Sequence, residues 1–147
     1  MNIDEKAALK LTEDETVTIL MEYLKSDSWT IESYCLGQQR GYDIVATRAN
    51  DRLYIEAKGA KASNQSPTKR RSYFDSGQIK DHFGKAIVKS LETKIEHPNA
   101  LVAIAHPDDQ DIRRTIGGTI PLIGKLGIMH FWVNKESTQL VVNPDPK

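Results

Sequence analysis

Two neighbouring stretches, residues 42–48 and 52–58, constrain the fold of this chain more than any other feature of its sequence. Both read as strands, and the polar tripeptide between them has the length of a hairpin loop. An antiparallel pair of strands is therefore expected. Residues 99–106 form a nearly continuous apolar run, which is typical of a central strand covered on both faces.

An amphipathic helix is predicted before the hairpin and another after it. The first begins near Thr12, where Thr12-Glu13-Asp14-Glu15 has the form of a capping box, and Glu13 shares the apolar face of this helix. The second begins at Asp75-Ser76-Gly77-Gln78, again with capping-box form. Its polar face carries four residues, Gln78, His82, Lys85 and Lys89.

The remaining pattern completes an α/β order of helix, three strands, helix and strand. Residues 29–36 form the expected first strand, and residues 107–109 open a short helix that Gly117-Gly118 ends. Residues 128–134 and 139–142 are expected as final strands. We expect one domain over residues 1–147, with a core at 12–106 and a C-terminal extension at 107–147.

The charge of the chain is unevenly distributed. Lys plus Arg and Asp plus Glu both number 20, so the formal net charge is zero. Residues 57–89 nevertheless carry eight basic and two acidic side chains. Residues 1–27, 28–56 and 90–147 are each slightly acidic. Such a segment is what a protein needs to bind a polyanion, although a lysine-rich surface loop would look the same.

Several classes of protein are excluded by composition. The single cysteine, Cys35, rules out an internal disulfide framework and a cysteine-built zinc site. The apolar runs are too short to span a membrane, and residues 1–10 do not form a signal peptide. The expectation is a cytoplasmic protein without a membrane partner.

The hairpin places charged residues where they can act together. Glu56 and Lys58 are two apart and so share one face of their strand, and antiparallel pairing brings Asp43 beside Glu56. Two carboxylates about 4 Å apart repel by roughly 4 kcal/mol at an effective dielectric near 20. Mg2+ or Mn2+ with oxygen ligands would relieve that repulsion, and the lysine would then hold a water or neutralise a phosphate oxygen.

A second match to the same spacing fails on geometry. Asp81 is followed by Glu92-Thr93-Lys94, but these residues lie in a helical pattern, where positions i and i+2 diverge by about 200°. Only the hairpin has the strand geometry that a shared ligand requires.

These residues resemble a known group of nucleases. Gly41-Tyr42-Asp43-Ile44 and Ile55-Glu56-Ala57-Lys58-Gly59, within the element order above, look like the PD-(D/E)XK superfamily of restriction endonucleases and Holliday junction resolvases. The resemblance covers roughly residues 12–106 and implies the three-layer restriction endonuclease-like core, with a mixed central sheet. Tyr42 replaces the proline of the family motif.

The resemblance also implies roles for individual residues. Asp43, Glu56 and the Ala57 carbonyl would bind Mg2+, and Lys58 would position the attacking water. Glu13 matches an acid that many members carry on the first helix, and Gln78 matches a glutamine near the site in several members. Structural alternatives remain: a surface ion-pair cluster for the hairpin charges, and helix-terminal roles for Glu13 and Gln78.

The nucleic-acid contacts are expected from the basic segment. Lys69, Arg70 and Arg71 are adjacent and repel one another, so a bound polyanion would stabilise them most. The positive face of the second helix comes next in the sequence. The candidate contact residues are Lys61, Lys69, Arg70, Arg71, His82, Lys85 and Lys89.

Three functions are compatible with these observations. The first is a metal-dependent nuclease acting on DNA. The second, its alternative, is a catalytically silent or partner-dependent nucleic-acid-binding module of the same fold. The third is a small-molecule or protein-binding domain whose basic loop only solubilises it. Cleavage of both strands by one small site would need a homodimer or two visits, and the sequence leaves this open.

Overall fold

The structure is a computed structural model that describes residues 2–62, 73–136 and 141–143. Its helices are α1 (Ile3–Leu9), α2 (Glu13–Ser26), α3 (Ser76–Glu96), α4 (Gln110–Ile116), the 3-10 turn η1 (Gly117–Thr119) and α5 (Ile120–Lys125). Its strands are β1 (Thr30–Tyr34), β2 (Ile44–Arg48), β3 (Asp51–Ala57), β4 (Leu101–Pro107), β5 (Ile128–Val133) and β6 (Val141–Asn143).

The strands form one mixed sheet in the order β1-β2-β3-β4-β5-β6. The pairs β1–β2, β2–β3 and β5–β6 are antiparallel, whereas β3–β4 and β4–β5 are parallel. β4 therefore lies inside the sheet, and six of its seven residues are buried, as its apolar sequence predicts.

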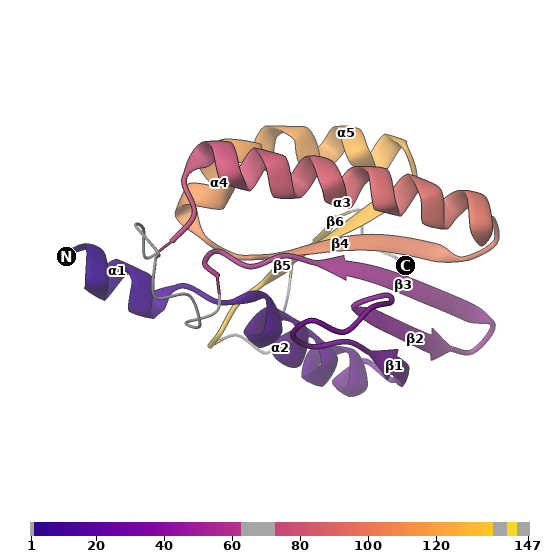
Figure 1. Cartoon of the computed structure of the whole chain (residues 1–147). Coiled ribbons are helices and arrows are strands. Elements are labelled where there is room, and N and C mark those ends of the chain that lie inside the picture. Colours follow the sequence, from indigo (N-terminus) through magenta and orange to yellow (C-terminus); the bar gives the residue numbers. More distant parts are fainter. Residues whose placement is uncertain (1, 63–72, 137–140, 144–147) are drawn as a thin grey trace.

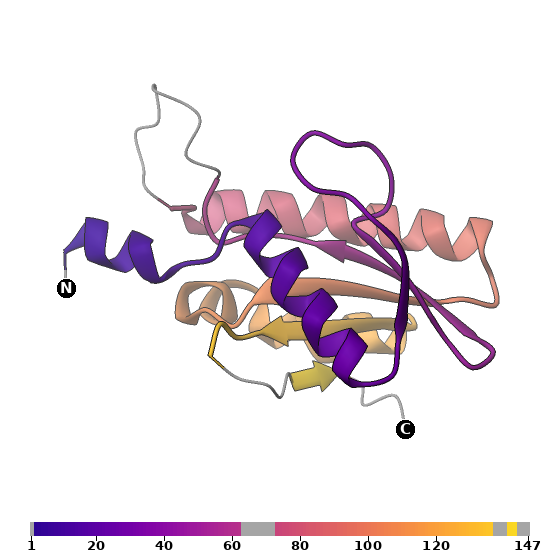
Figure 2. The ribbon, with the colours of Figure 1, turned by 90° about the horizontal axis from the view of Figure 1, so that it is seen from below.

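Helices cover both faces of this sheet (Figures 1 and 2). α2 crosses one face, and α3, α4 and α5 lie on the other. The expected α/β core with three layers and a mixed central sheet is thus confirmed. No helix within the described part of the chain is long and apolar enough to cross a membrane.

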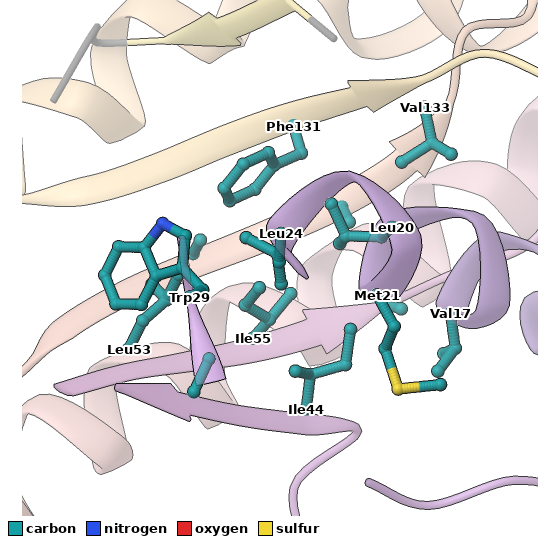
Figure 3. Close-up of a cluster of buried hydrophobic side chains, with 14 of the residues drawn as sticks. Val17, Leu20, Met21, Leu24, Trp29, Ile44, Leu53, Ile55, Phe131 and Val133 are labelled. Carbon is teal, nitrogen blue, oxygen red and sulfur yellow. The ribbon is translucent and has the colours of Figure 1, made fainter. Parts of the chain in front are cut away.

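Two hydrophobic cores fill the spaces between the layers. On the α2 side, Val17, Leu20 and Leu24 pack on inward side chains of β2, β3 and β5, together with Trp29 (Figure 3). On the other side, Ile79 and Phe83 of α3 pack with isoleucines of α4 and α5. Burial of these side chains drives the sheet and both helical layers together.

Both predicted capping boxes are present, on Thr12 with Glu15 and on Asp75 with Gln78. Strand ends differ from the predicted ones by at most two residues. The hairpin closes more tightly than expected, because Arg48 already pairs with Asp51. Ala49 adopts a positive φ of 54° in this turn. α1 was not predicted.

Candidate active site

Asp43 directly precedes β2, whose last pair with β3 is Ile44 with Ile55. Its carboxyl group interacts with that of Glu56, the residue after Ile55. Asp43 is only 8 % exposed, and its Oδ2 accepts a hydrogen bond from the backbone N–H of Ala57 at 2.8 Å. The proximity of the two carboxyl groups, expected from the strand pattern, is therefore present.

The charge balance of this pair is unfavourable without a cation. Burial raises the pKa of Asp43 to about 8, and the hydrogen bond and charge of Glu56 add to the rise, as does the charge of Glu13. The N–H of Ala57 acts in the opposite direction, since it stabilises the ionised form. Too little positive charge reaches Asp43 to keep it ionised at neutral pH.

Glu56 binds Lys89 of α3. Its Oε2 lies 2.8 Å from the Lys89 Nζ, and the side chain of Glu56 is 11 % exposed. Burial lowers the pKa of Lys89, but the hydrogen bond and charge of Glu56 outweigh that effect, so the net result is a raised pKa. Lys89 also donates to the Gly41 carbonyl at 3.2 Å, which directs its ammonium group into the site.

Glu13 reaches the site because α2 begins beside the end of β3. The N–H of Ala60 donates to the Leu11 carbonyl at 2.8 Å, and an added Cβ at Gly59 would lie 2.4 Å from the Glu13 nitrogen. Only glycine permits this approach. Burial raises the pKa of Glu13, the charge of Lys58 lowers it, and that of Glu56 raises it further, with a net rise.

A cleft of about 310 Å3 opens at this junction of α2, β3 and α3. Its lining includes Glu13, Lys58 and His82, whose side chains could take part in acid–base or electrostatic catalysis. Burial lowers the pKa of His82, and the charges of Lys58 and Lys85 lower it further. His82 is therefore neutral at pH 7, with its ring edge-on to Phe74.

The structure separates the predicted nucleic-acid contacts into different positions. Lys61 lines the cleft, but its Nζ donates to the Ala7 carbonyl at 2.8 Å. Lys85 is exposed on α3, whereas Lys89 is bound to Glu56, although its side chain stays 41 % exposed. Lys69, Arg70 and Arg71 lie outside the described residues.

Gln78 serves the capping box of α3. Its Oε1 accepts from the Asp75 N–H at 3.0 Å, and its own N–H donates to the Asp75 carboxylate at 2.9 Å. Gln78 is not among the residues that line the cleft. The structure thus places it in the helix-terminal role that its sequence position also predicted.

The acidic pair has oxygen ligands suited to a hard divalent cation. Asp43 and Glu56 are both largely buried, one carboxylate oxygen of Asp43 is not engaged by Ala57, and Lys89 supplies one positive charge for the two acids. No group of three His, Cys, Asp or Glu side chains converges for a metal within the described ranges. Mg2+ is commonly held by one or two carboxylates with waters and substrate phosphates, so two carboxylates fit this ion.

Two positioning features were not assigned by the sequence analysis. Gly59 brings α2 against β3, and Lys89 compensates the charge of Glu56. The i+11 spacing of Lys89 from Gln78 gave its helix face, but the partner across the fold could not be read from that spacing.

The fold and site together define an α/β protein with a mixed sheet between helical layers and a buried acidic pair beside a cleft. A solved structure with this fold is an FdxN element excision controlling factor protein from Anabaena variabilis. Its TM-score is 0.55 at 16 % sequence identity, and the match covers 86 % of this chain and 95 % of that chain. The likeness concerns the fold. No protein-family model matches the chain, and no curated protein sequence is similar to it.

Proposed function

We propose that this protein is a metal-dependent nuclease of the PD-(D/E)XK type that hydrolyses phosphodiester bonds of DNA. The observation that carries the proposal is the buried pair of Asp43, directly before β2, and Glu56 on β3, with Lys58 lining a neighbouring cleft. Independent features support it: the strand phase that displays Glu56 with Lys58, and the fold with helices on both faces of a mixed sheet.

Asp43, Glu56 and the Ala57 carbonyl would hold Mg2+ or Mn2+. Such an ion, when bound, polarises a phosphoryl oxygen and lowers the pKa of a bound water. Its charge would also relieve the repulsion that raises the pKa of Asp43. Lys89 would then have to share or release Glu56, because its ammonium group now compensates the same carboxylate.

The other residues of the cleft have roles that follow from their charge. Lys58 would orient the attacking water or compensate charge that develops on a phosphate oxygen. Glu13 lies close enough to interact electrostatically with Lys58, and so would keep that ammonium group in place. His82 is neutral and partly buried, so it can donate or accept a hydrogen bond without adding charge.

DNA as the partner is supported by the basic segment and by the solved structure that has a similar fold. Residues 57–89 carry the only strongly positive charge in the sequence. The similar protein is described as a controlling factor for excision of an element, and a role on DNA for this chain is compatible with that description.

One observation favours a second candidate, a nucleic-acid-binding module of the same fold that does not cleave alone. Lys89 Nζ lies 2.8 Å from Glu56, where it already supplies a positive charge. If that ion pair persists with Mg2+ present, the acidic pair would be structural and the basic surface would carry the function.

The test is cleavage of duplex, single-stranded and branched DNA with Mg2+ or Mn2+. We expect Asp43→Asn, Glu56→Gln and Lys58→Met each to lower the cleavage rate by about 100-fold or more, with DNA binding retained. Titration of Mn2+ into each protein, followed calorimetrically, should show weaker binding for the two carboxylate variants.

Matched controls come from the same chain. Asp51→Asn changes an exposed acid at the other end of the same hairpin, and Lys135→Met changes an exposed lysine after β5; both should cleave as the original chain does. Full activity in Asp43→Asn would refute the proposed site. Salt-sensitive DNA binding without cleavage under every condition would establish the second candidate instead.

A further inference from the structure

α3 has two apolar faces, of which only one is buried. Ile79, Phe83 and Ala86 pack inward against the sheet. On the outward side, Val88 is 58 % exposed, Leu91 38 % and Ile95 80 %. A helix that covers a sheet needs only one apolar stripe, so the outward stripe has no role in the fold of a single chain.

The outward residues have the spacing of a coiled-coil seam. Gly84, Val88, Leu91 and Ile95, which we name the outer seam, follow one another at intervals of four, three and four residues. This alternation is the heptad pattern, with β-branched Val88 and Ile95 at one position and Leu91 at the other. All four are exposed, and an added Cβ at Gly84 would meet no atom within 4 Å.

We propose that the outer seam binds the outer seam of a second copy of this chain, with the two α3 helices antiparallel about a two-fold axis. In that arrangement Val88 packs on Leu91 of the second copy, and Ile95 packs over Gly84. The most exposed large side chain of the seam thus fills the space left by the residue without a side chain. The interface is self-complementary, as two-fold symmetry requires.

Charge favours the same orientation. Lys85 and Glu92 are seven residues apart on the same flank of the seam, so antiparallel pairing places Lys85 of each copy near Glu92 of the other. Neither side chain forms an ion pair with another described residue. Lys94, on the opposite flank, donates to the Gly127 carbonyl at 3.3 Å and is held away from the seam.

A parallel pairing is disfavoured by the same residues. It would set Gly84 against Gly84, which leaves a void, and would bring Lys80 of one copy near Lys85 of the other. The antiparallel dimer leaves the cleft free, because no residue of the outer seam lines it. This inference does not depend on nuclease activity.

The experiment is sedimentation velocity of the full chain over a wide concentration range. We expect a reversible shift from monomer to dimer mass as concentration rises. Ile95→Asp and Leu91→Asp should raise the dimer dissociation constant about tenfold or more. Leu122→Asp, which changes an exposed leucine of α5 outside the seam, should leave it unchanged.

A charge exchange separates a specific interface from general stickiness. Lys85→Glu and Glu92→Lys should each weaken the dimer, and the double variant should restore it, because both inter-copy pairs reform with reversed signs. Circular dichroism checks that each variant is folded. A monomer at all concentrations, an unchanged dimer in Ile95→Asp, or failure of the double variant to recover would each overturn the proposal.

Discussion

At the scale of single residues, two buried imidazoles lie against each other in the sheet. His106 Nδ1 and His130 Nε2 lie 2.8 Å apart and share a hydrogen bond. Both residues are at most 1 % exposed, and their other ring nitrogens have no hydrogen-bond partner in the described structure. Burial lowers the pKa of His130 to about 3 and holds that of His106 well below its usual value, the charge of the neighbouring histidine adding to the latter.

The pair makes folding stability sensitive to acid. Both imidazoles stay neutral in the folded chain, whereas the unfolded chain binds protons below about pH 6.5. Each therefore costs the fold about 1.4 kcal/mol per pH unit between that value and its own folded pKa. We expect the advantage of the His106→Leu/His130→Leu variant over the original chain to grow as pH falls from 7 to 5.

Urea unfolding at each pH measures this difference. The raised pKa of Asp43 acts with the opposite sign, since the folded chain then holds a proton that the unfolded chain has lost above pH 4. That contribution is common to both proteins and cancels in the comparison. Leu122→Ala, at an exposed side chain of α5 that does not titrate, should leave the pH profile unchanged. A pH-independent difference between the two main proteins would contradict the assignment.

At the scale of elements, the junction of β3 and α2 determines where the site forms. A Cβ at Gly59 would lie 2.4 Å from the Glu13 nitrogen and 2.7 Å from the Thr12 carbonyl carbon. Both are backbone atoms, so a larger residue must move the start of α2. We expect Gly59→Ala to lower the free energy of unfolding in water by about 1–3 kcal/mol and to reduce cleavage beyond the fraction unfolded.

The matched control is Gly118→Ala, since an added Cβ there meets nothing within 4 Å. Its stability in urea should stay within about 0.5 kcal/mol of the original. Equal effects of the two substitutions would show that the close approach at Gly59 has no consequence.

Local patterns predicted those elements that local forces determine. Both capping boxes appear because their hydrogen bonds join residues three apart. α1 was missed although it has a local signal, since Asn2 caps it by accepting from the Glu5 N–H at 2.8 Å. Its other support comes from far along the chain, where Lys61 binds the Ala7 carbonyl. Likewise Lys10, at its end, binds Asp109 and Asp111. For the same reason, strand phase could place Asp43 beside Glu56, but it could not predict the ion pair between Lys89 and Glu56.

At the scale of the whole molecule, the uneven charge predicts the response of DNA binding to salt. Four to five phosphate contacts would give a slope of about −4 in log affinity against log salt concentration. Replacing Lys69, Arg70 and Arg71 with alanine should make that slope shallower by about 2.5. Fluorescence anisotropy with a short duplex at several salt concentrations measures both values.

The control for this measurement removes positive charge elsewhere. Lys125 and Lys135 lie in the C-terminal extension, and their replacement by alanine should leave the slope unchanged. A slope near zero for the original chain would remove both DNA-dependent functions and favour a small-molecule or protein ligand.

The backbone hydrogen bonds of Ala60 determine how freely the length of the following segment can change. The Ala60 N–H donates to the Leu11 carbonyl, and the Ala60 carbonyl accepts from the Phe74 N–H at 3.0 Å. Ala60 and Phe74 are therefore held together by a backbone hydrogen bond. The cost of closing a loop grows only logarithmically, about 0.6 kcal/mol for each doubling of its length. The thirteen-residue span between those two amides can therefore be lengthened or shortened at little thermodynamic cost, while the hydrogen bonds at Ala60 keep its two ends together.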